Sequence, residues 1–171
     1  MRALIPCRPV LLIGTCAALY LTVSSHWHIV PRFIYNPSAS APRGWYQVSP
    51  AVGLKVDDYV LANLSPSVKR LAAERGYLPE SVPLLKRIGA LADQFVCVRR
   101  HSLWVDGRLA ATALTHDGRG RELVAWPDCR VLAPDEILLV SRDNSASFDS
   151  RYFGPIRVTQ VIGKASPLWV W

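Results

Sequence analysis

The chain has 171 residues, of which 50% are hydrophobic and 19% are charged, so it is long enough for one domain and too apolar to remain disordered. Its 20 basic and 13 acidic residues give a net charge of +7, which is compatible with nucleic acid or with an anionic membrane surface. The arginines are scattered, and the sequence has no long basic run, no zinc-ligand spacing and no basic-aromatic RNA motif. We therefore expect a mildly basic protein of the cell envelope with no nucleic-acid partner.

The first predicted element is the uncharged segment 9–31, which follows two arginines. About 20 helical residues, rising about 1.5 Å each, cross a hydrocarbon core of about 30 Å, so this segment is long enough to span a membrane. The preceding arginines favour a cytoplasmic N-terminus with the rest of the chain exported. We predict that residues 1–31 form a cytoplasmic tip and a single membrane anchor, and that residues 32–171 form the exported domain. The alternative is a signal peptide that is cleaved near Ser25.

The exported part is predicted to be mainly β. Short runs of strand-forming residues alternate with Gly and Pro turns, which is typical of a barrel or a folded antiparallel sheet. The pair Asp106-Gly107 between two apolar runs is the strongest hairpin signal in the chain. The expected strands lie within 57–64, 83–91, 94–100, 103–111, 136–142, 156–163 and 167–171.

One short helix is predicted between the first two of these strands. Ser65 is a suitable N-cap, Pro66 suits the first helical turn, and Gly76 follows the expected end. Its apolar stripe consists of Val68, Leu71 and Ala72. We interpret this helix as an excursion between strands rather than as a functional site.

The four cysteines fall into two groups. Cys97 and Cys129 lie in the exported part, where thiols can be oxidised, and they are too far apart for a CxxC redox motif. No histidine pair completes a zinc site, so we expect no metal. We predict a disulfide between these two cysteines, with two unpaired buried thiols as the alternative. Cys7 and Cys16, in or beside the anchor, are not expected to pair.

A serine hydrolase would need a base beside its nucleophile, and no histidine has a context that marks it as one. The histidines are His26, His28, His101 and His116. A lysine can activate a serine only if burial lowers its pKa well below about 10.4. Lys86 stands in the apolar run 83–91, although a lysine in a strand usually faces solvent. On pattern alone, the serines of "NPSASAPRGWY" (36–46) would be interpreted as part of a linker.

Four blocks in this order resemble those of the membrane-bound Ser/Lys signal peptidases: "PSASAP", "VDDYVLANL", "LLKRIGALAD" and "SASFDSRYFGPI" followed by "IGKA". The last block is the most specific. The segments "SAPRGWY", "GRELVAWPDC", "SFDSRYFGP" and the terminal "ASPLWVW" are most similar to the TraF-type peptidases of conjugative transfer. This resemblance covers nearly the whole chain and implies a signal-peptidase-like antiparallel sheet.

The resemblance also implies roles for individual residues. Ser40 matches the nucleophile and Lys86 the general base, while the Ser38 hydroxyl and the Ser40 backbone N–H match the oxyanion hole. We expect Ser38 and Ser40 to face one side of an extended segment. The supporting residues implied are Ser147, which would orient the lysine, and the charged pair Asp149 and Arg151. No metal or organic cofactor is implied.

Three departures from the family pattern occur at Ala41, Ala92 and Trp45, which replace the usual Met, Gly and Leu. We expect these positions to contact substrate or to form turns. They therefore bear on specificity more than on the chemistry of the serine and the lysine.

The implied function is that of an endopeptidase anchored in a bacterial inner membrane, with its catalytic domain in the periplasm. Its expected partners are the lipid bilayer, a pilin or other exported precursor as substrate, and the conjugative secretion machinery. The acyl-enzyme would be resolved by water or by an amine of the substrate, which would cyclise the pilin. The alternatives are a general type I signal peptidase and a non-catalytic envelope scaffold of a secretion apparatus.

Overall fold

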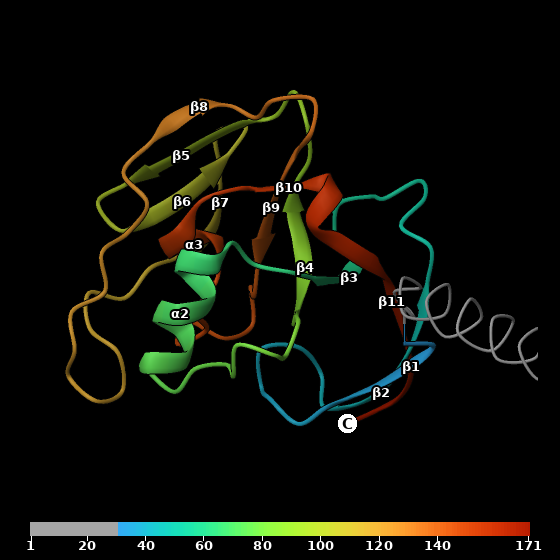
Figure 1. The fold of residues 1–171 in the computed structure, drawn as a ribbon. Helices are drawn as coiled ribbons and strands as arrows, with labels where there is room; N and C mark the ends of the chain where they lie inside the picture. Colours follow the sequence, from blue (N-terminus) through green and yellow to red (C-terminus); the bar gives the residue numbers. More distant parts are fainter. Residues whose placement is uncertain (1–30) are drawn as a thin grey trace, which may run out of the picture. The chain divides into compact units, whose positions relative to one another are not determined.

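A seven-stranded antiparallel sheet forms the larger part of the computed structural model, which describes residues 31–171 (Figure 1). Every pair of neighbouring strands in it is antiparallel. In spatial order, the strands are β1 (Phe33–Asn36), β2 (Gly44–Ser49), β11 (Val161–Val170), β3 (Tyr59–Ala62), β4 (Leu84–Ala90), β9 (Glu136–Val140) and β10 (Ile156–Arg157). The fold is therefore mainly β with a curled antiparallel sheet, as predicted.

A second sheet of four strands lies at the end of the domain remote from β1 and β2 (Figure 1). Its spatial order is β7 (Arg108–Thr112), β6 (Ser102–Val105), β5 (Phe95–Arg99) and β8 (Cys129–Val131). The hairpin predicted at Asp106-Gly107 is confirmed, because these residues join β6 to β7 with φ angles of 46° and 75°. Both central residues of a type I′ turn require positive φ. The sequence patterns did not reveal β1, β2 or β8.

The predicted helix is α2 (Pro66–Glu74), with Ser65 as N-cap and Gly76 at a φ of 67° beyond its end. Ala72 is buried, whereas Leu71 is 39% exposed, so the predicted apolar stripe is only partly correct.

Besides the predicted helix, residues 31–171 contain two shorter helical turns that the sequence patterns did not indicate. A single turn, α3 (Ser150–Phe153), begins where the Asp149 carboxylate accepts a hydrogen bond from the Arg151 backbone N–H, and a 3-10 turn, η1 (Val158–Gln160), interrupts the strand expected at 156–163. Helical turns this short show no apolar periodicity that a sequence pattern can reveal.

The central strands of the larger sheet are buried on both faces. In β3, Val60 and Ala62 belong to one apolar cluster, while Leu61 between them belongs to another. In β9, Leu139 packs in the first of these clusters and Leu138 in a third one that includes residues of the smaller sheet. Because both faces are covered, these segments are continuous apolar runs rather than alternating ones.

Strand β4 carries the candidate lysine into this interior. Leu84, Lys86 and Ile88 share one face of the strand, because side chains alternate along it. Leu84 and Ile88 lie in the same apolar cluster as Val60, and Val68 of α2 packs against that cluster. The helix excursion therefore helps to cover the face of β4 from which Lys86 projects.

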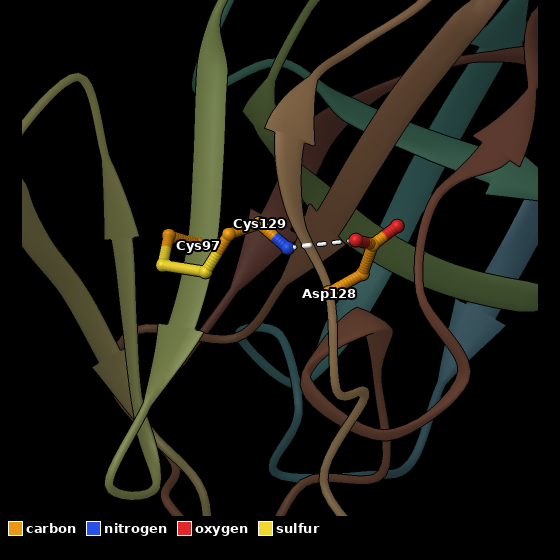
Figure 2. The surroundings of a disulfide bond; sticks show 3 residues. All are labelled: Cys97, Asp128 and Cys129. Atoms are coloured by element: carbon orange, nitrogen blue, oxygen red, sulfur yellow. Dashed lines mark hydrogen bonds between the residues drawn. A yellow bond between two sulfur atoms is a disulfide. The ribbon is translucent and has the colours of Figure 1, made fainter.

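The structure joins Cys97 and Cys129 in the predicted disulfide (Figure 2). The two residues are directly opposite one another on β5 and β8. The backbone N–H of Cys129 also donates to the Asp128 carboxylate at 2.8 Å. Cys7 and Cys16 lie outside the described residues.

The predicted membrane anchor also lies outside the described residues, except for Pro31. Between Pro31 and Trp171, no helix combines the length and the hydropathy needed to cross a membrane.

Replacing Cys97 and Cys129 together by alanine should lower the free energy of unfolding by about 3–4 kcal/mol, because the bridge restricts the unfolded chain over a long loop. Urea denaturation of the oxidised protein and of the double variant measures this difference. The control is the Cys7→Ala/Cys16→Ala variant, which should unfold like the parent. Equal stability of all three proteins would contradict the prediction.

Candidate active site

A cavity of about 730 Å³ lies between the loop that joins β1 to β2, the beginning of β4 and the loop that precedes α3. Ser38, Ser40, Lys86 and Ser147 all line it. The remaining walls are mostly apolar and include Leu61, Leu64 and Leu84. The structure therefore brings together four of the predicted site residues from three separate parts of the chain.

The two serines of the first loop are hydrogen-bonded to each other, with 2.9 Å between their hydroxyl oxygens. Ser38 is exposed and Ser40 is half-buried. The expectation of an extended segment was wrong, because the chain bends at Ser38 and turns at Ala39 and Ser40. The turn brings the two hydroxyls together, and not the alternation by which residues i and i+2 of a strand share one side.

Lys86 is 2% exposed, and its ammonium donates a hydrogen bond to the Ser147 hydroxyl. Burial lowers the pKa of Lys86 to about 8, because a charged amine loses its hydration there. The Asp149 carboxylate opposes this shift in pKa and the Arg151 guanidinium reinforces it. A lysine with this pKa is partly neutral at mildly alkaline pH, so its amine can accept a proton.

Asp149 and Arg151 form a buried ion pair with two parallel contacts, and the two residues are 0% and 1% exposed. Arg151 Nε lies 2.8 Å from Asp149 Oδ1, and Arg151 Nη2 lies 2.8 Å from Asp149 Oδ2. The backbone N–H of Ser141 donates to the same carboxylate at 2.9 Å. A pair whose lone pairs and protons are satisfied in this way is stable in an apolar interior.

Arg151 also fixes the loop that carries Ser147. Its guanidinium donates to the carbonyl oxygens of Ser147 at 2.9 Å, Asn144 at 3.1 Å and Thr112 at 2.6 Å. Removing one partner of such a pair leaves a buried charge uncompensated, which typically costs about 3–5 kcal/mol. The charged pair thus positions Ser147, which in turn binds Lys86.

The two candidate catalytic groups line the same cavity and have different hydrogen-bond partners. Ser40 is hydrogen-bonded to Ser38 and Lys86 to Ser147, and within the described residues no hydrogen bond links Ser40 to Lys86. Asn144 connects the two halves of the site, because its side-chain amide donates to the Ala39 carbonyl at 3.2 Å. Neither His101 nor His116 lines the cavity.

Sequence patterns missed Asn36, the last residue of β1. Its side chain is buried beneath the turn that carries the two serines and is hydrogen-bonded to Ser38. An asparagine before a proline is an ordinary turn signal, so nothing local distinguishes it. Its importance depends on loop carbonyl groups that only the folded chain brings around it.

Two glycines of the family-like blocks are explained by close packing. A Cβ on Gly154, which has a φ of 76°, would lie 2.7 Å from Trp126 Nε1. A Cβ on Gly44 would lie 2.0 Å from the Trp169 carbonyl oxygen. The blocks "SFDSRYFGP" and "GRELVAWPDC" therefore meet in space, as do "SAPRGWY" and the terminal "ASPLWVW".

The three departures from the family pattern occupy different environments. Ala41 is buried in an apolar cluster, and Trp45 is 44% exposed on the outer side of β2. Neither residue lines the cavity, and a contact of either with substrate stays a prediction. Ala92 precedes Asp93, whose φ of 65° marks the expected turn.

Residues 8–171 match the family model of the signal peptidases, peptidase family S26. The chain is 30% identical to the "Conjugal transfer protein TraF" of Agrobacterium tumefaciens (strain 15955), with 95% of this chain and 96% of the relative covered. It is also 30% identical to a "Plasmid transfer protein TraF" of Escherichia coli, over 80% and 82%. A crystal structure of a signal peptidase I from Enterococcus faecalis V583 matches with a TM-score of 0.41 and 17% identity, covering 67% of this chain and 97% of that one.

Peptide cleavage should accelerate as the pH rises and should be half-maximal near pH 8, because the lowered pKa of Lys86, about 8, sets the fraction of neutral amine. Lys86→Arg should be inactive throughout this range, since a guanidinium does not lose its proton in proteins. Initial rates between pH 6 and about pH 10 measure both effects. Lys55→Arg, at an exposed lysine, is the control and should behave like the parent. A flat pH profile would exclude Lys86 as the base.

Proposed function

The chain belongs to the TraF-type branch of the signal peptidase family S26, and from this premise we propose that it is a serine endopeptidase whose catalytic dyad is Ser40 and Lys86. Its substrate is the precursor of a pilin subunit in a conjugative transfer system. The observation that carries the dyad is the buried Lys86, with a pKa of about 8, in the cavity that also exposes Ser40. Membership of the family implies a serine peptidase, and its TraF relatives act in conjugation.

The reaction begins when the neutral amine of Lys86 removes the proton of Ser40. The Ser40 oxygen then attacks the scissile carbonyl, and the Ser38 hydroxyl and the Ser40 backbone N–H donate to the oxyanion that develops. Such donors typically contribute about 10²–10³ in rate. The ammonium of Lys86 returns the proton to the leaving amine as the peptide bond breaks. Ser147 holds the lysine throughout this step.

The acyl-enzyme has two outcomes. Attack by water releases a linear product, whereas attack by an amine of the same pilin releases a cyclic one. The second outcome is favoured where the N-terminus of the pilin lies close to the ester, because holding two reacting ends together replaces a bimolecular step. The largely apolar walls of the cavity suit small apolar side chains, such as Ala, before the cleavage site.

The catalytic domain works against the outer face of the inner membrane, to which the segment 9–31 anchors it. Exposed aromatic side chains lie on β1, on β2 and at or just after the end of β11, and we call them together the aromatic face: Phe33, Tyr35, Trp45, Trp169 and Trp171. Tyr35 stands 5.4 Å from Trp45 and 6.2 Å from Trp171 between ring centroids. Aromatic rings of this kind favour the boundary between lipid and water. Phe33, the first residue of this face along the chain, comes two residues after Pro31, where the described domain begins.

Ser40→Ala should abolish precursor processing and conjugative transfer while the protein folds normally, because the change removes the nucleophile and very little packing. Immunoblots of the pilin and mating frequencies measure this. Ser67→Ala, at an exposed serine on α2, is the matched control and should behave like the parent. Mass spectrometry of the mature pilin distinguishes the two outcomes, because a cyclic product is one water lighter than the linear one.

Intact transfer with fully processed pilin in the Ser40→Ala strain would refute the dyad. A general signal peptidase is the conclusion if deletion of the protein stops the processing of unrelated secreted precursors. A scaffold role is the conclusion if deletion blocks transfer but the Ser40→Ala variant does not.

A reporter fused after Trp171 should be exported, and the full-length protein should stay in the membrane pellet after carbonate extraction. Release of a shortened, soluble protein would show that the segment 9–31 is a cleaved signal.

Replacing Trp169 and Trp171 by serine should slow the cleavage of a membrane-inserted precursor several-fold and leave the cleavage of a soluble peptide unchanged. This difference is expected because the aromatic face contacts lipid and not the scissile bond.

A further inference from the structure

Asn36 is almost completely buried, at 6% exposed, directly beneath the turn that carries Ser38 and Ser40. Its Nδ2 lies 3.0 Å from each of three carbonyl oxygens, those of Ser38, Ala41 and Pro42. Its Oδ1 accepts from the Ser38 backbone N–H at 3.1 Å and from the Ser38 hydroxyl at 2.8 Å. One side chain therefore contacts both ends of the loop that surrounds the nucleophile.

These contacts fix which way the amide of Asn36 points. Carbonyl oxygens only accept hydrogen bonds, so the atom that faces three of them is the donating NH₂ group. The atom that faces the Ser38 N–H is then the carbonyl oxygen. It follows that the Ser38 hydroxyl donates its single proton to Asn36 Oδ1.

The direction of the bond between the two serines follows from this assignment. Ser38 has only one hydroxyl proton, and that proton is directed at Asn36. Across the 2.9 Å contact, Ser40 must therefore be the donor and Ser38 the acceptor. The resting Ser40 proton thus points to Ser38 and not to Lys86.

We propose that Asn36 is a positioning residue for the nucleophile. It holds the shape of the loop that carries Ser38 and Ser40, and it accepts the proton of the Ser38 hydroxyl. The Ser38 oxygen is then the acceptor that keeps Ser40 in its resting orientation. This inference rests on the proposed function of the two serines. When substrate binds, Ser40 turns its proton to Lys86, and Ser38 turns its proton from Asn36 to the oxyanion. The Ser38 N–H and the three carbonyl groups stay bound to Asn36, so the loop keeps its shape during this exchange of partners.

The chemistry of the position requires an amide. An aspartate would retain the acceptor for Ser38 but would place a carboxylate oxygen against three carbonyl oxygens and remove both donated protons. An alanine would leave all of these loop groups without their partner. A displacement of about 1 Å in a catalytic group can reduce the rate by about 10²-fold.

The test compares Asn36→Ala, Asn36→Asp and Asn36→Ser with the parent protein in cleavage of the same precursor peptide. For the first two variants, kcat should fall by about 10- to 100-fold with KM changed less than about threefold, because the nucleophile and not the cavity wall is displaced. Asn36→Ser retains one hydroxyl donor and acceptor and should recover part of kcat. Asn63→Ala, at an exposed asparagine, is the control and should match the parent.

The pH profile distinguishes positioning from general damage to the site. The midpoint of the rate should stay where the parent has it, because the environment of Lys86 is built by β4, Ser147 and the Asp149–Arg151 pair. Only the plateau should fall. A shifted midpoint would show that Asn36 acts on the lysine and would overturn the inference.

A double variant, Asn36→Ala with Ser38→Ala, tests the route of the effect. If Asn36 acts through Ser38, the two losses in kcat should not multiply, because the second change removes a hydroxyl that is already misdirected. Fully multiplicative losses would overturn this route. The folded fraction of each variant is measured by circular dichroism and used to normalise kcat. Should Asn36→Ala fail to fold, Asn36→Ser carries the same comparison.

Parent-like kcat in folded Asn36→Ala would overturn the inference and leave the proposed dyad intact. Full activity of Ser40→Ala would instead refute the proposed function, whatever the Asn36 variants do.

Discussion

The burial of one amine, that of Lys86, is the constraint on which the rest of the site depends. A lysine in an exposed strand keeps its proton at neutral pH, so the proposed base exists only if β4 is covered on the face that carries it. The excursion through α2 helps to cover this face, and burial lowers the pKa of Lys86 to about 8. Asp149 alone would raise this pKa again, but Arg151 binds the same carboxylate through two contacts and opposes its field. The buried ion pair therefore holds Ser147 in place without raising the pKa of Lys86 back to its ordinary value.

The two halves of the site come from distant parts of the chain and are assembled by the same principle. Backbone carbonyl groups of each loop converge on one buried polar side chain, Arg151 beneath the Ser147 loop and Asn36 beneath the serine turn. Asn144 then links the two loops through its bond to the Ala39 carbonyl. Because these hydrogen bonds are made to backbone carbonyl groups, they hold each loop independently of the side chains at its surface. This arrangement explains how exposed turns can present hydroxyl groups with the accuracy that acyl transfer needs.

Much of the fold could be predicted from the sequence, and the exceptions have physical causes. The Asp106-Gly107 turn was recognisable because positive φ at two consecutive positions restricts the residues that fit there. Strands β1 and β2 were missed because exposed aromatic residues such as Phe33 and Trp45 stand among the buried ones such as Tyr46, so the apolar pattern does not show which face is covered. The burial of Lys86 could not be derived from its strand, since cover comes from a helix and from a loop near the C-terminus. The apolar run 83–91 drew attention to that lysine, but only the resemblance to a family implied that it is the base, and that resemblance did not indicate Asn36.

The hydrogen-bond partners in the resting site constrain how the proposed reaction starts. Within residues 31–171, every buried side-chain nitrogen and oxygen has a hydrogen-bond partner. Ser40 is bound to Ser38, and Lys86 is bound to Ser147, so each half of the proposed dyad starts with a partner of its own. The Ser40 proton must leave Ser38 before Lys86 can accept it. A bound peptide changes the balance, because its carbonyl oxygen offers the Ser38 proton a second acceptor. Once Ser38 turns toward the substrate, Ser40 loses the partner that held its proton, and the neutral amine across the cavity becomes the acceptor that remains. In this scheme the substrate itself completes the catalytic arrangement, as is common where catalytic hydrogen bonds form only in the complex.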